Sequence, residues 1–492
     1  MVALATLAGC GSMAPAYDAP APGLPERYGH AAGAADAAAD LLAADLPWQQ
    51  YFHDEQLQAL IATALENNHD LRTAVLRVQE AQAAYGVQRS ALAPTVGLGA
   101  DATRGRTPAE LSLTGQAYTA NQLQAGLGIS SWEIDFWGRI ASLNEAALQS
   151  FLATDAARRA TTMSLVAQVA NAWLSLREID ERLRLAQQSE TSQRESLRIF
   201  TRRFEVGAAA RLELTQVQTL LAQAESLVVQ LQQQREVQLH ALDILLGGAV
   251  VPANPVASVH GSGNGPDSQV LQPLAPGLPS QLLQSRPDII AAEHQLRAAN
   301  ANIGAARAAF FPRITLTAFG GVASSELDDL FRGASRAWSF APSLSLPIFD
   351  AGRNRANLDL AEVRRNLAVV QYEQTVQNAF RDVADALSAQ HWLQQQVQVQ
   401  QRALVAQQER ARLSRLSYDN GASSFLEVLD AERNLISAEQ QVVQTRHALL
   451  ASRVALYAAL GGGSSQLAGA PLLPAPRIPD AAQPATPSSS VE

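Results

Sequence analysis

The sequence has almost no cysteine, few aromatic residues and few charges. Of 492 residues, one is cysteine, 5% are aromatic and 17% are charged. A single cysteine excludes an internal disulfide and a cysteine-based zinc site. The net charge of −9 argues against a nucleic-acid binder, because no basic surface would balance a phosphate backbone. No run of about eighteen apolar residues occurs, so no transmembrane helix is expected.

Motifs that carry enzymatic chemistry are missing as well. The chain has no glycine-rich phosphate loop, and its eight histidines are spread along the sequence rather than clustered. We therefore expect no catalytic site, no cofactor and no bound metal. Alanine, leucine and glutamine are abundant instead, and this composition favours helices.

The one cysteine lies near the start of the chain, in the segment LATLAGC. Leu7-Ala8-Gly9-Cys10 has the form of a bacterial lipobox. In that motif the signal peptidase cleaves the chain before the cysteine, here Cys10, which then carries acyl chains. Residues 1–9 would be the signal peptide, and an Ala/Pro-rich lipidated linker would follow over 10–50. No Lys or Arg precedes the apolar stretch, so the start codon could lie upstream. The alternative is a chance apolar start with a buried cysteine.

The sequence contains an internal duplication. Residues 70–99 align with 288–317 at a constant offset of 218, which places Asp70 on Asp288. Further along the offset is 214, and three glycines recur at matching positions: Gly138, Gly207 and Gly247 fall on Gly352, Gly421 and Gly461. We predict two repeats, 51–248 and 281–462, with a connector over 249–280 and a disordered tail over 463–492.

Between the matched glycines, each repeat has two long stretches without glycine or proline. These predict helices over ~138–204 and ~210–246 in the first repeat, and over ~352–418 and ~424–460 in the second. The longer helix of each pair would be roughly 100 Å long. Apolar residues step by three and four in the second helix of the first repeat, which is coiled-coil spacing. Each repeat is therefore predicted to form a long coiled helical hairpin with Gly207 or Gly421 at its tip.

Four short segments between the helices alternate apolar and polar residues. We predict strands over ~94–104, ~121–132, ~312–322 and ~337–348, paired into two β-hairpins. One face of the last strand carries Trp338, Phe340, Pro342, Leu344, Leu346 and Ile348. The segments fit either half-buried hairpins of a soluble α+β domain or apolar-out strands of a membrane barrel. Four strands cannot close a barrel, whereas two copies would supply eight strands and three would supply twelve.

These features together resemble the outer membrane factors of tripartite efflux pumps and type I secretion systems, the TolC/OprM family. The resemblance covers about residues 48–462 and includes the tip segments RFEVGAAARLELTQVQ and SYDNGASSFLEVLDAER. The lipobox is more similar to the lipoprotein branch of the family than to the secretion branch.

The resemblance implies a mostly α-helical fold with membrane β-strands. It implies a homotrimer with a twelve-stranded outer-membrane barrel and a periplasmic α-helical tunnel. The implied partners are a periplasmic adaptor, an inner-membrane RND transporter and outer membrane lipid. The implied function is passive export of small molecules and drugs.

The resemblance also implies a gate just past the second tip. In the family the helices there coil inward and close the tunnel, which implicates Leu426, Glu427 and Asp430. Leu426 lies four positions before Asp430 and Glu427 lies three positions before it, so all three can share one helix face. Beside them, Tyr418 is expected to bond to Glu213. The alternative is that Glu427 and Asp430 are solvated charges near a helix N-terminus, where the helix dipole favours acids.

This sequence departs from the family pattern at the gate. Ser423 lies where the family has an arginine, and Leu212 lies where it has a hydroxyl residue. In the first repeat Gln216 falls opposite Asp430, so only the second repeat supplies the inner acid. These two departures leave open whether a salt bridge is part of the latch, and closure would depend more on Leu426 and Asp430.

The two tips, Gly207-Ala208 and Gly421-Ala422, are implied to bind the adaptor. Their small residues permit close approach of another helix, whereas the simpler alternative is a tight turn that needs glycine for a positive φ. Two other functions remain open for the whole chain. It would be either an outer membrane duct for type I protein secretion or a non-channel coiled-coil lipoprotein.

Overall fold

The computed structural model describes residues 12–21, 23, 43–248, 271–272, 274 and 279–468. The chain divides into two compact units. The sheet unit comprises Met1–Ala21, Arg77–Asp155 and Ala291–Gln374, and the hairpin unit comprises Pro22–Leu76, Ala156–Ile290 and Thr375–Glu492. Cys10 and the predicted signal peptide lie outside the described residues, as do most of the connector and most of the tail.

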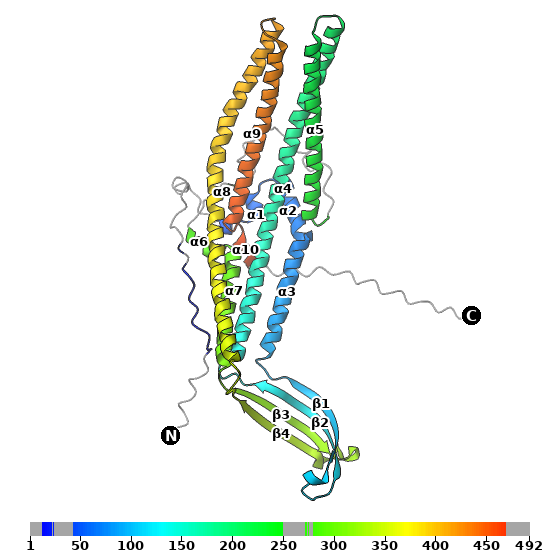
Figure 1. Cartoon of the computed structure of the whole chain (residues 1–492), viewed down its shortest axis with the longest axis vertical. Coiled ribbons are helices and arrows are strands. Elements are labelled where there is room, and N and C mark those ends of the chain that lie inside the picture. Colours follow the sequence, from blue (N-terminus) through cyan, green and yellow to red (C-terminus); the bar gives the residue numbers. More distant parts are fainter. Residues whose placement is uncertain are drawn as a thin grey trace, which may run out of the picture. The chain divides into compact units, whose positions relative to one another are not determined.

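The sheet unit contains a four-stranded antiparallel sheet (Figure 1). Its strands, paired in this order, are β1 (Val96–Thr107), β2 (Tyr118–Glu133), β3 (Arg313–Ser324) and β4 (Arg336–Ser345). The two hairpins come from different repeats and are joined through β2 and β3, so the edges of the sheet are β1 and β4. The connecting loops contain the short 3-10 helices η3 (Ala109–Leu111), η5 (Leu327–Asp329) and η6 (Gly333–Ser335).

Alternation along the strands gives the sheet one apolar face. Leu98 of β1 pairs with Leu127 of β2, as the alternating pattern requires. These apolar side chains are not covered by the rest of the chain, because Leu98 and Trp338 are each 82% exposed. A half-buried hairpin of a soluble domain would have buried them.

The last strand is shorter than the sequence predicts. β4 ends at Ser345, so Leu346 and Ile348 lie beyond it. Pro347 separates these two residues and has no N–H to donate to a neighbouring strand. Their apolar side chains continued the alternation, which therefore overestimated the length of the strand.

Small residues let the helices of the sheet unit pack closely. The unit includes parts of α3 (His69–Ser90), α4 (Arg139–Glu205), α7 (Pro287–Ala308) and α8 (Arg353–Asp419). Ala146 of α4 packs with Ala298 and Ala301 of α7, and each is at most 6% exposed. Beside them, His294 Nδ1 lies 2.6 Å from Gln149 Oε1.

Part of the predicted linker is held against α7 rather than forming a loose tether. The hydroxyl of Tyr17 donates to Glu293 Oε1 at 3.3 Å, and the guanidinium of Arg297 lies 4.9 Å from the centre of the Tyr17 ring. Asn300 Nδ2 donates to the carbonyl oxygen of Pro15 at 2.9 Å. The Ala/Pro-rich composition of the linker did not indicate this contact, since its polar partners lie almost 300 residues away.

The hairpin unit is built around two long helical hairpins. The first pairs α4 with α5 (Arg211–Leu245), and the second pairs α8 with α9 (Phe425–Ala459). α4 and α8 have 67 residues each and α5 and α9 have 35 each, so the two repeats have matching helices. The longer helices extend for about 100 Å. An apolar seam closes the first hairpin, where Ala186 of α4 packs with Val228 and Leu231 of α5.

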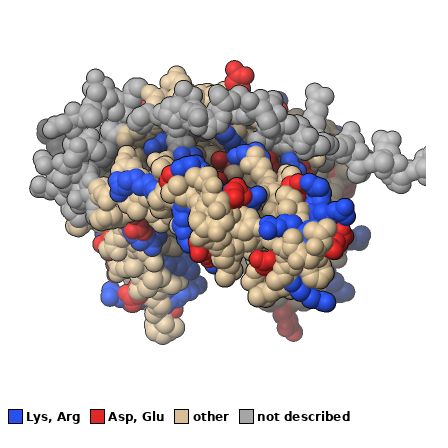
Figure 2. All heavy atoms as spheres, turned by 90° about the horizontal axis from the view of Figure 1, so that it is seen from above, with Lys and Arg blue, Asp and Glu red and all other residues tan. Residues whose placement is uncertain are grey.

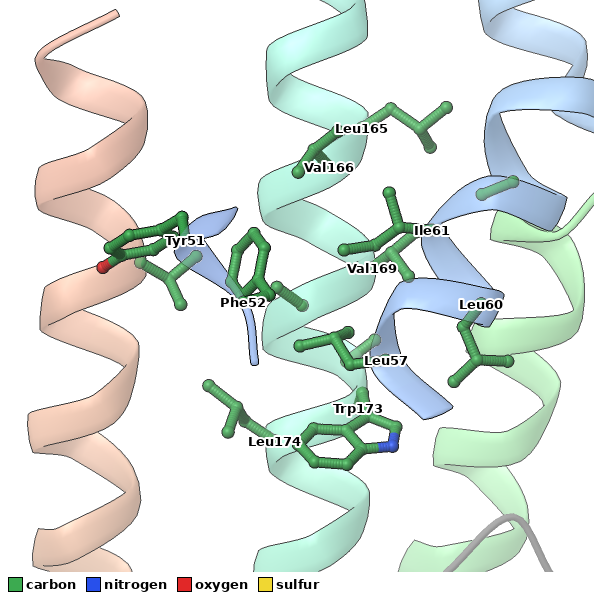
Figure 3. Close-up of a cluster of buried hydrophobic side chains, with 14 of the residues drawn as sticks. Tyr51, Phe52, Leu57, Leu60, Ile61, Leu165, Val166, Val169, Trp173 and Leu174 are labelled. Carbon is green, nitrogen blue, oxygen red and sulfur yellow. The ribbon is translucent and has the colours of Figure 1, made fainter. Parts of the chain in front are cut away.

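The main core of the hairpin unit lies where α1 (Trp48–Tyr51) and α2 (Glu55–Asn67) pack against α4 (Figure 3). Phe52 and Trp173 are fully buried there. Tyr51 stacks on Tyr457 of α9 with ring centroids 4.2 Å apart. The Tyr457 hydroxyl donates to the carbonyl oxygen of Leu46 at 2.9 Å.

Two further segments that were predicted to be loose are folded. The end of the linker contains the 3-10 helix η2 (Ala43–Asp45) and Leu46, which is 2% exposed. The start of the tail forms α10 (Ser464–Ala468), where Ser464 Oγ donates to the carbonyl oxygen of Ser285 at 2.6 Å. Both segments are held by partners distant in the sequence, Tyr457 for Leu46 and Ser285 for Ser464, which the local sequence does not show.

The duplication recurs in the backbone contacts. Gly247, after α5, has φ +73°, and a Cβ there would overlap the carbonyl oxygen of Asn67. Gly461, after α9, has φ +80°, and a Cβ there would lie 3.0 Å from the carbonyl oxygen of Ser285, the last residue of α6 (Pro279–Ser285). Asn67 and Ser285 are equivalent at the offset of 218. Among the described residues, no helix combines the length and the apolar composition needed to span a membrane.

Candidate functional site

The two hairpin tips have the same backbone geometry. Gly207 and Gly421 each have φ +73°, which a residue with a side chain rarely adopts. The N–H of Ala208 donates to the carbonyl oxygen of Arg203 at 2.7 Å, and that of Ala422 donates to Ser417 at 2.9 Å. This pattern of bonds ends a helix on a left-handed glycine. The turn itself therefore accounts for the two glycines.

A cluster of apolar side chains, here called the tip core, joins the four helices near their tips. The buried members are Phe200 of α4, Val217 of α5, and Phe425, Val428 and Leu429 of α9, and the partly buried Tyr418 of α8 packs against them. The rings of Phe200 and Phe425 lie 4.1 Å apart, so the first and second hairpins are in direct contact here. The tip core therefore couples the position of one hairpin to that of the other.

Arg203 of α4 makes a polar contact between the hairpins. Its guanidinium donates to the hydroxyl of Tyr418 on α8 and lies 5.3 Å from the centre of the Phe200 ring. The predicted bond between Tyr418 and Glu213 is wrong. Glu213 Oε2 instead accepts from the N–H of Ala210 at 2.9 Å, which caps the start of α5.

Asp430 is paired with arginines within the second hairpin. Arg410 of α8 donates to its Oδ2 at 2.6 Å, and Arg433 of α9 donates to its Oδ1 at 2.5 Å. Asn434 Nδ2 adds a third bond at 3.1 Å. The Asp430 side chain is 36% exposed, so these pairs are partly accessible to water. The negative charge of Asp430 is therefore balanced by two arginines of the same hairpin.

The two hairpins differ at the positions of this ion pair. Ser196 and Gln216 of the first hairpin correspond to Arg410 and Asp430 of the second at the offset of 214. Next to the tip core, Leu426 is 55% exposed, and Glu427 is exposed as well. An exposed leucine one turn from an ion-paired aspartate is available for contact outside the chain.

The sequence analysis did not identify the three arginines that make these contacts, Arg203, Arg410 and Arg433. For Arg410 a signal was present, because residues about equally distant from the tip glycine face each other across an antiparallel hairpin. Arg410 precedes Gly421 by eleven positions and Asp430 follows it by nine. Arg433 follows Asp430 by three positions, which is also contact distance on a helix.

Charges of both signs are interspersed at the end of the molecule viewed from above (Figure 2). Many of the exposed charges near the tips pair along their own helix, such as Arg198 with Glu195 and Arg412 with Glu409. The hydrogen bonds from these arginines lower the pKa of Glu195 and of Glu409. A partner at the tips would therefore meet a mixed surface rather than a field of one sign.

The chain matches a family model described as outer membrane efflux protein twice, over residues 60–248 and 278–462. It is 44% identical over 429 residues to the toluene efflux pump outer membrane protein TtgF of Pseudomonas putida, covering 87% of this chain and 88% of that protein. It is 40% identical over 463 residues to the outer membrane protein OprJ of Pseudomonas aeruginosa, covering 93% and 94%.

Solved structures show the same similarity. The open state of the MtrE outer membrane channel of Neisseria gonorrhoeae has a TM-score of 0.82 at 36% identity, covering 92% of this chain and 98% of that one. A membrane protein from Pseudomonas aeruginosa has a TM-score of 0.84 at 39% identity, covering 92% and 100%. The two matches to the family model fall on the two structural repeats. The chain therefore belongs to the outer membrane efflux protein family.

Proposed function

We propose that this chain is the outer membrane duct of a tripartite RND-type efflux pump, a passive homotrimer that exports small molecules. Relatives include proteins named for toluene and antibiotic efflux pumps. The observation that carries the proposal is a pair of faces, one on α8 and one on α3, that the chain leaves uncovered although the equivalent faces of α4 and α7 cover each other.

The first uncovered face lies on α8. α4 and α8 are equivalent helices, but their corresponding positions differ in burial. Ala146 and Ala153 of α4 are 6% and 4% exposed. Their counterparts on α8, Leu360 and Leu367, are 46% and 63% exposed although they are larger and more apolar. α8 therefore presents the face that α4 buries.

The second uncovered face lies on α3. Within the chain, Ala298 and Ala301 of α7 cover Ala146 of α4. The counterpart of α7 in the first repeat is α3, where Glu80 and Ala83 occupy these positions and are exposed. α3 of one copy on α8 of the next would repeat the contact that α7 makes with α4.

Such a contact is head-to-tail, and head-to-tail contacts form a ring when the rotation between neighbouring copies closes on itself. The sheet fits the same ring, since its edge strands β1 and β4 would pair between neighbouring copies. Three copies give twelve strands, whose exposed apolar face would contact lipid. Helices of about 100 Å are too long for a bilayer core of roughly 30 Å and would extend into the periplasm.

In this ring the tips form the periplasmic gate. Leu426 and Asp430 would repeat around the three-fold axis, with Glu427 beside them, and the contact of Arg203 with Tyr418 would hold the second hairpin against the first. A periplasmic adaptor would bind the turns at Gly207-Ala208 and Gly421-Ala422. Energy for export would come from the inner-membrane transporter, so the chain itself would need no catalytic group.

The test of the assembly is the protein mass of the detergent-extracted particle, measured by light scattering. The proposal expects about three times the 52.4 kDa chain. Ala83→Cys together with Leu360→Cys should form disulfides between copies, because these positions correspond to the contact of Ala301 with Ala146. Each single cysteine variant is the matched control. A monomer, or no cross-link beyond the controls, refutes the ring.

The gate is tested by conductance. Asp430→Ala combined with Leu426→Ala should raise the single-channel conductance in planar bilayers, because it removes both side chains assigned to the constriction. A conductance equal to that of the wild-type protein would remove these residues from the gate. Export of a protein substrate, but of no small molecule, would favour the secretion duct instead.

A further inference from the structure

Three arginines lie on the apolar face of the sheet, at the ends of the strands far from the helices. Arg104 and Arg106 follow Leu98 on β1 at even spacing, so they share its face. Arg336 precedes Trp338 by two positions on β4 and shares the face of that residue. All three arginine side chains are exposed.

The distance of the arginines from the helix-side ends of the strands is close to the thickness of the apolar band of a membrane barrel. Arg104 lies eight positions from Val96, the first residue of β1, and Arg336 lies eight positions from Leu344 at the other end of β4. Eight residues span about 27 Å along a strand, or about 20 Å of height at the usual barrel tilt. The apolar band of an outer-membrane barrel is about 25 Å tall. The guanidinium groups therefore lie where lipid headgroups begin.

The arginines have no acidic side chain opposite them in the sheet. Residues opposite them in the register are uncharged: Arg104 faces Asn121, and Arg336 faces Val322. In the adjoining loop Arg332 pairs with Asp329 at 2.5 Å. Among the residues that the structure describes, no ion pair involves Arg104, Arg106 or Arg336.

The arginines occur only on the edge strands at this level. β1 supplies Arg104 and Arg106, β4 supplies Arg336, and the inner strands carry none there. In the proposed ring β4 of one copy lies beside β1 of the next, about 4.8 Å away. Arginines of two copies then meet on neighbouring strands, and the cluster is incomplete in a single chain.

We propose that each junction between copies binds the phosphate groups of a phosphorylated glycolipid in the outer leaflet of the membrane. This inference rests on the proposed trimeric barrel. Guanidinium groups bind phosphate oxygens in bidentate fashion, and the apolar side chains below them, including Trp338, contact the acyl chains. Charged residues also protect open sheet edges from pairing. That role ends once the ring has closed, whereas the three exposed cations remain at the lipid surface.

Native mass spectrometry of the full acylated protein in detergent tests the proposal. The probe is a diphosphorylated lipid A, compared with the same lipid after removal of both phosphates. The wild-type trimer should bind up to three phosphorylated lipids. Arg336→Gln should weaken binding about fivefold, and Arg104→Gln with Arg106→Gln about 25-fold. Arg332→Gln, which removes an arginine that is paired in the loop, should bind as the wild type does.

Two results would overturn the proposal. One is binding within twofold of the wild type in both Arg→Gln variants, and the other is equal binding of the dephosphorylated lipid. The protein mass in the same spectrum reports the number of copies. A particle other than a trimer refutes the proposed function and this inference with it. A trimer whose lipid binding ignores the arginines refutes the inference alone.

Discussion

Arg203 tests whether the contact between the hairpins keeps the tip closed. Arg203→Gln removes the charge that donates to Tyr418 and lies over the Phe200 ring. The tip core remains, because glutamine does not alter the packing of Phe200 on Phe425. The second hairpin should then separate from the first more easily.

The size of the effect follows from the environment of this contact. A hydrogen bond from a charged donor is worth about 1.5–3 kcal/mol when buried, and a partly exposed one is worth less. We take about 1 kcal/mol for each copy, to which the cation–π contact adds a fraction. Three copies that open together would lose about 3 kcal/mol, a shift of roughly a hundredfold in the closed–open equilibrium.

The assay is the open fraction of single channels in planar bilayers. Arg202→Gln is the matched control, because Arg202 is the neighbouring arginine and pairs with Glu205 on its own helix at 3.1 Å. Tyr418→Phe, which removes only the hydroxyl, should reproduce most of the effect of Arg203→Gln. An open fraction of Arg203→Gln within twofold of that of Arg202→Gln would refute the reasoning.

Three further predictions concern stability. Phe425→Ala removes an aromatic ring from the tip core and should lower the free energy of local unfolding at the tips by about 3–5 kcal/mol. Proteolysis at the tips should therefore accelerate, and an unchanged rate would contradict this packing. Tyr457→Phe leaves the buried carbonyl oxygen of Leu46 without its donor and should cost about 1 kcal/mol, measured as a lower midpoint of thermal unfolding. Burial lowers the pKa of His447, so the folded state binds fewer protons than the unfolded state as the pH falls below about 6.5. The midpoint of thermal unfolding should therefore fall as the pH is lowered, and it should fall less in His447→Gln. Parallel pH profiles of the wild type and this variant would exclude His447 as the cause.

The long helices follow from local sequence. A stretch without glycine or proline continues as a helix because nothing in it interrupts the backbone hydrogen bonds. The next glycine with a positive φ ends it, which explains why the turns lie at Gly207 and Gly421. The duplication was equally visible, since equal intervals between glycines require only the order of the residues.

The partners of individual side chains did not follow from local sequence. Tyr418 was expected to bond to Glu213, but Glu213 caps its own helix, and Arg203 of another helix reaches the hydroxyl. The pairing of Asp430 with Arg410 depends on the register of α8 against α9. Register is set by the packing of both helices together, which a single helical pattern leaves undetermined.

The sequence by itself determined the repeats, the hairpins, the apolar face of the strands and the family. These depend on the order and periodicity of residues along the chain. Only the tertiary structure decided that the linker lies against α7, that the tail begins with a helix, and that α8 exposes the face that α4 buries. The physical reason is that burial and ion pairing are properties of two surfaces, and the second surface is supplied by residues distant in sequence.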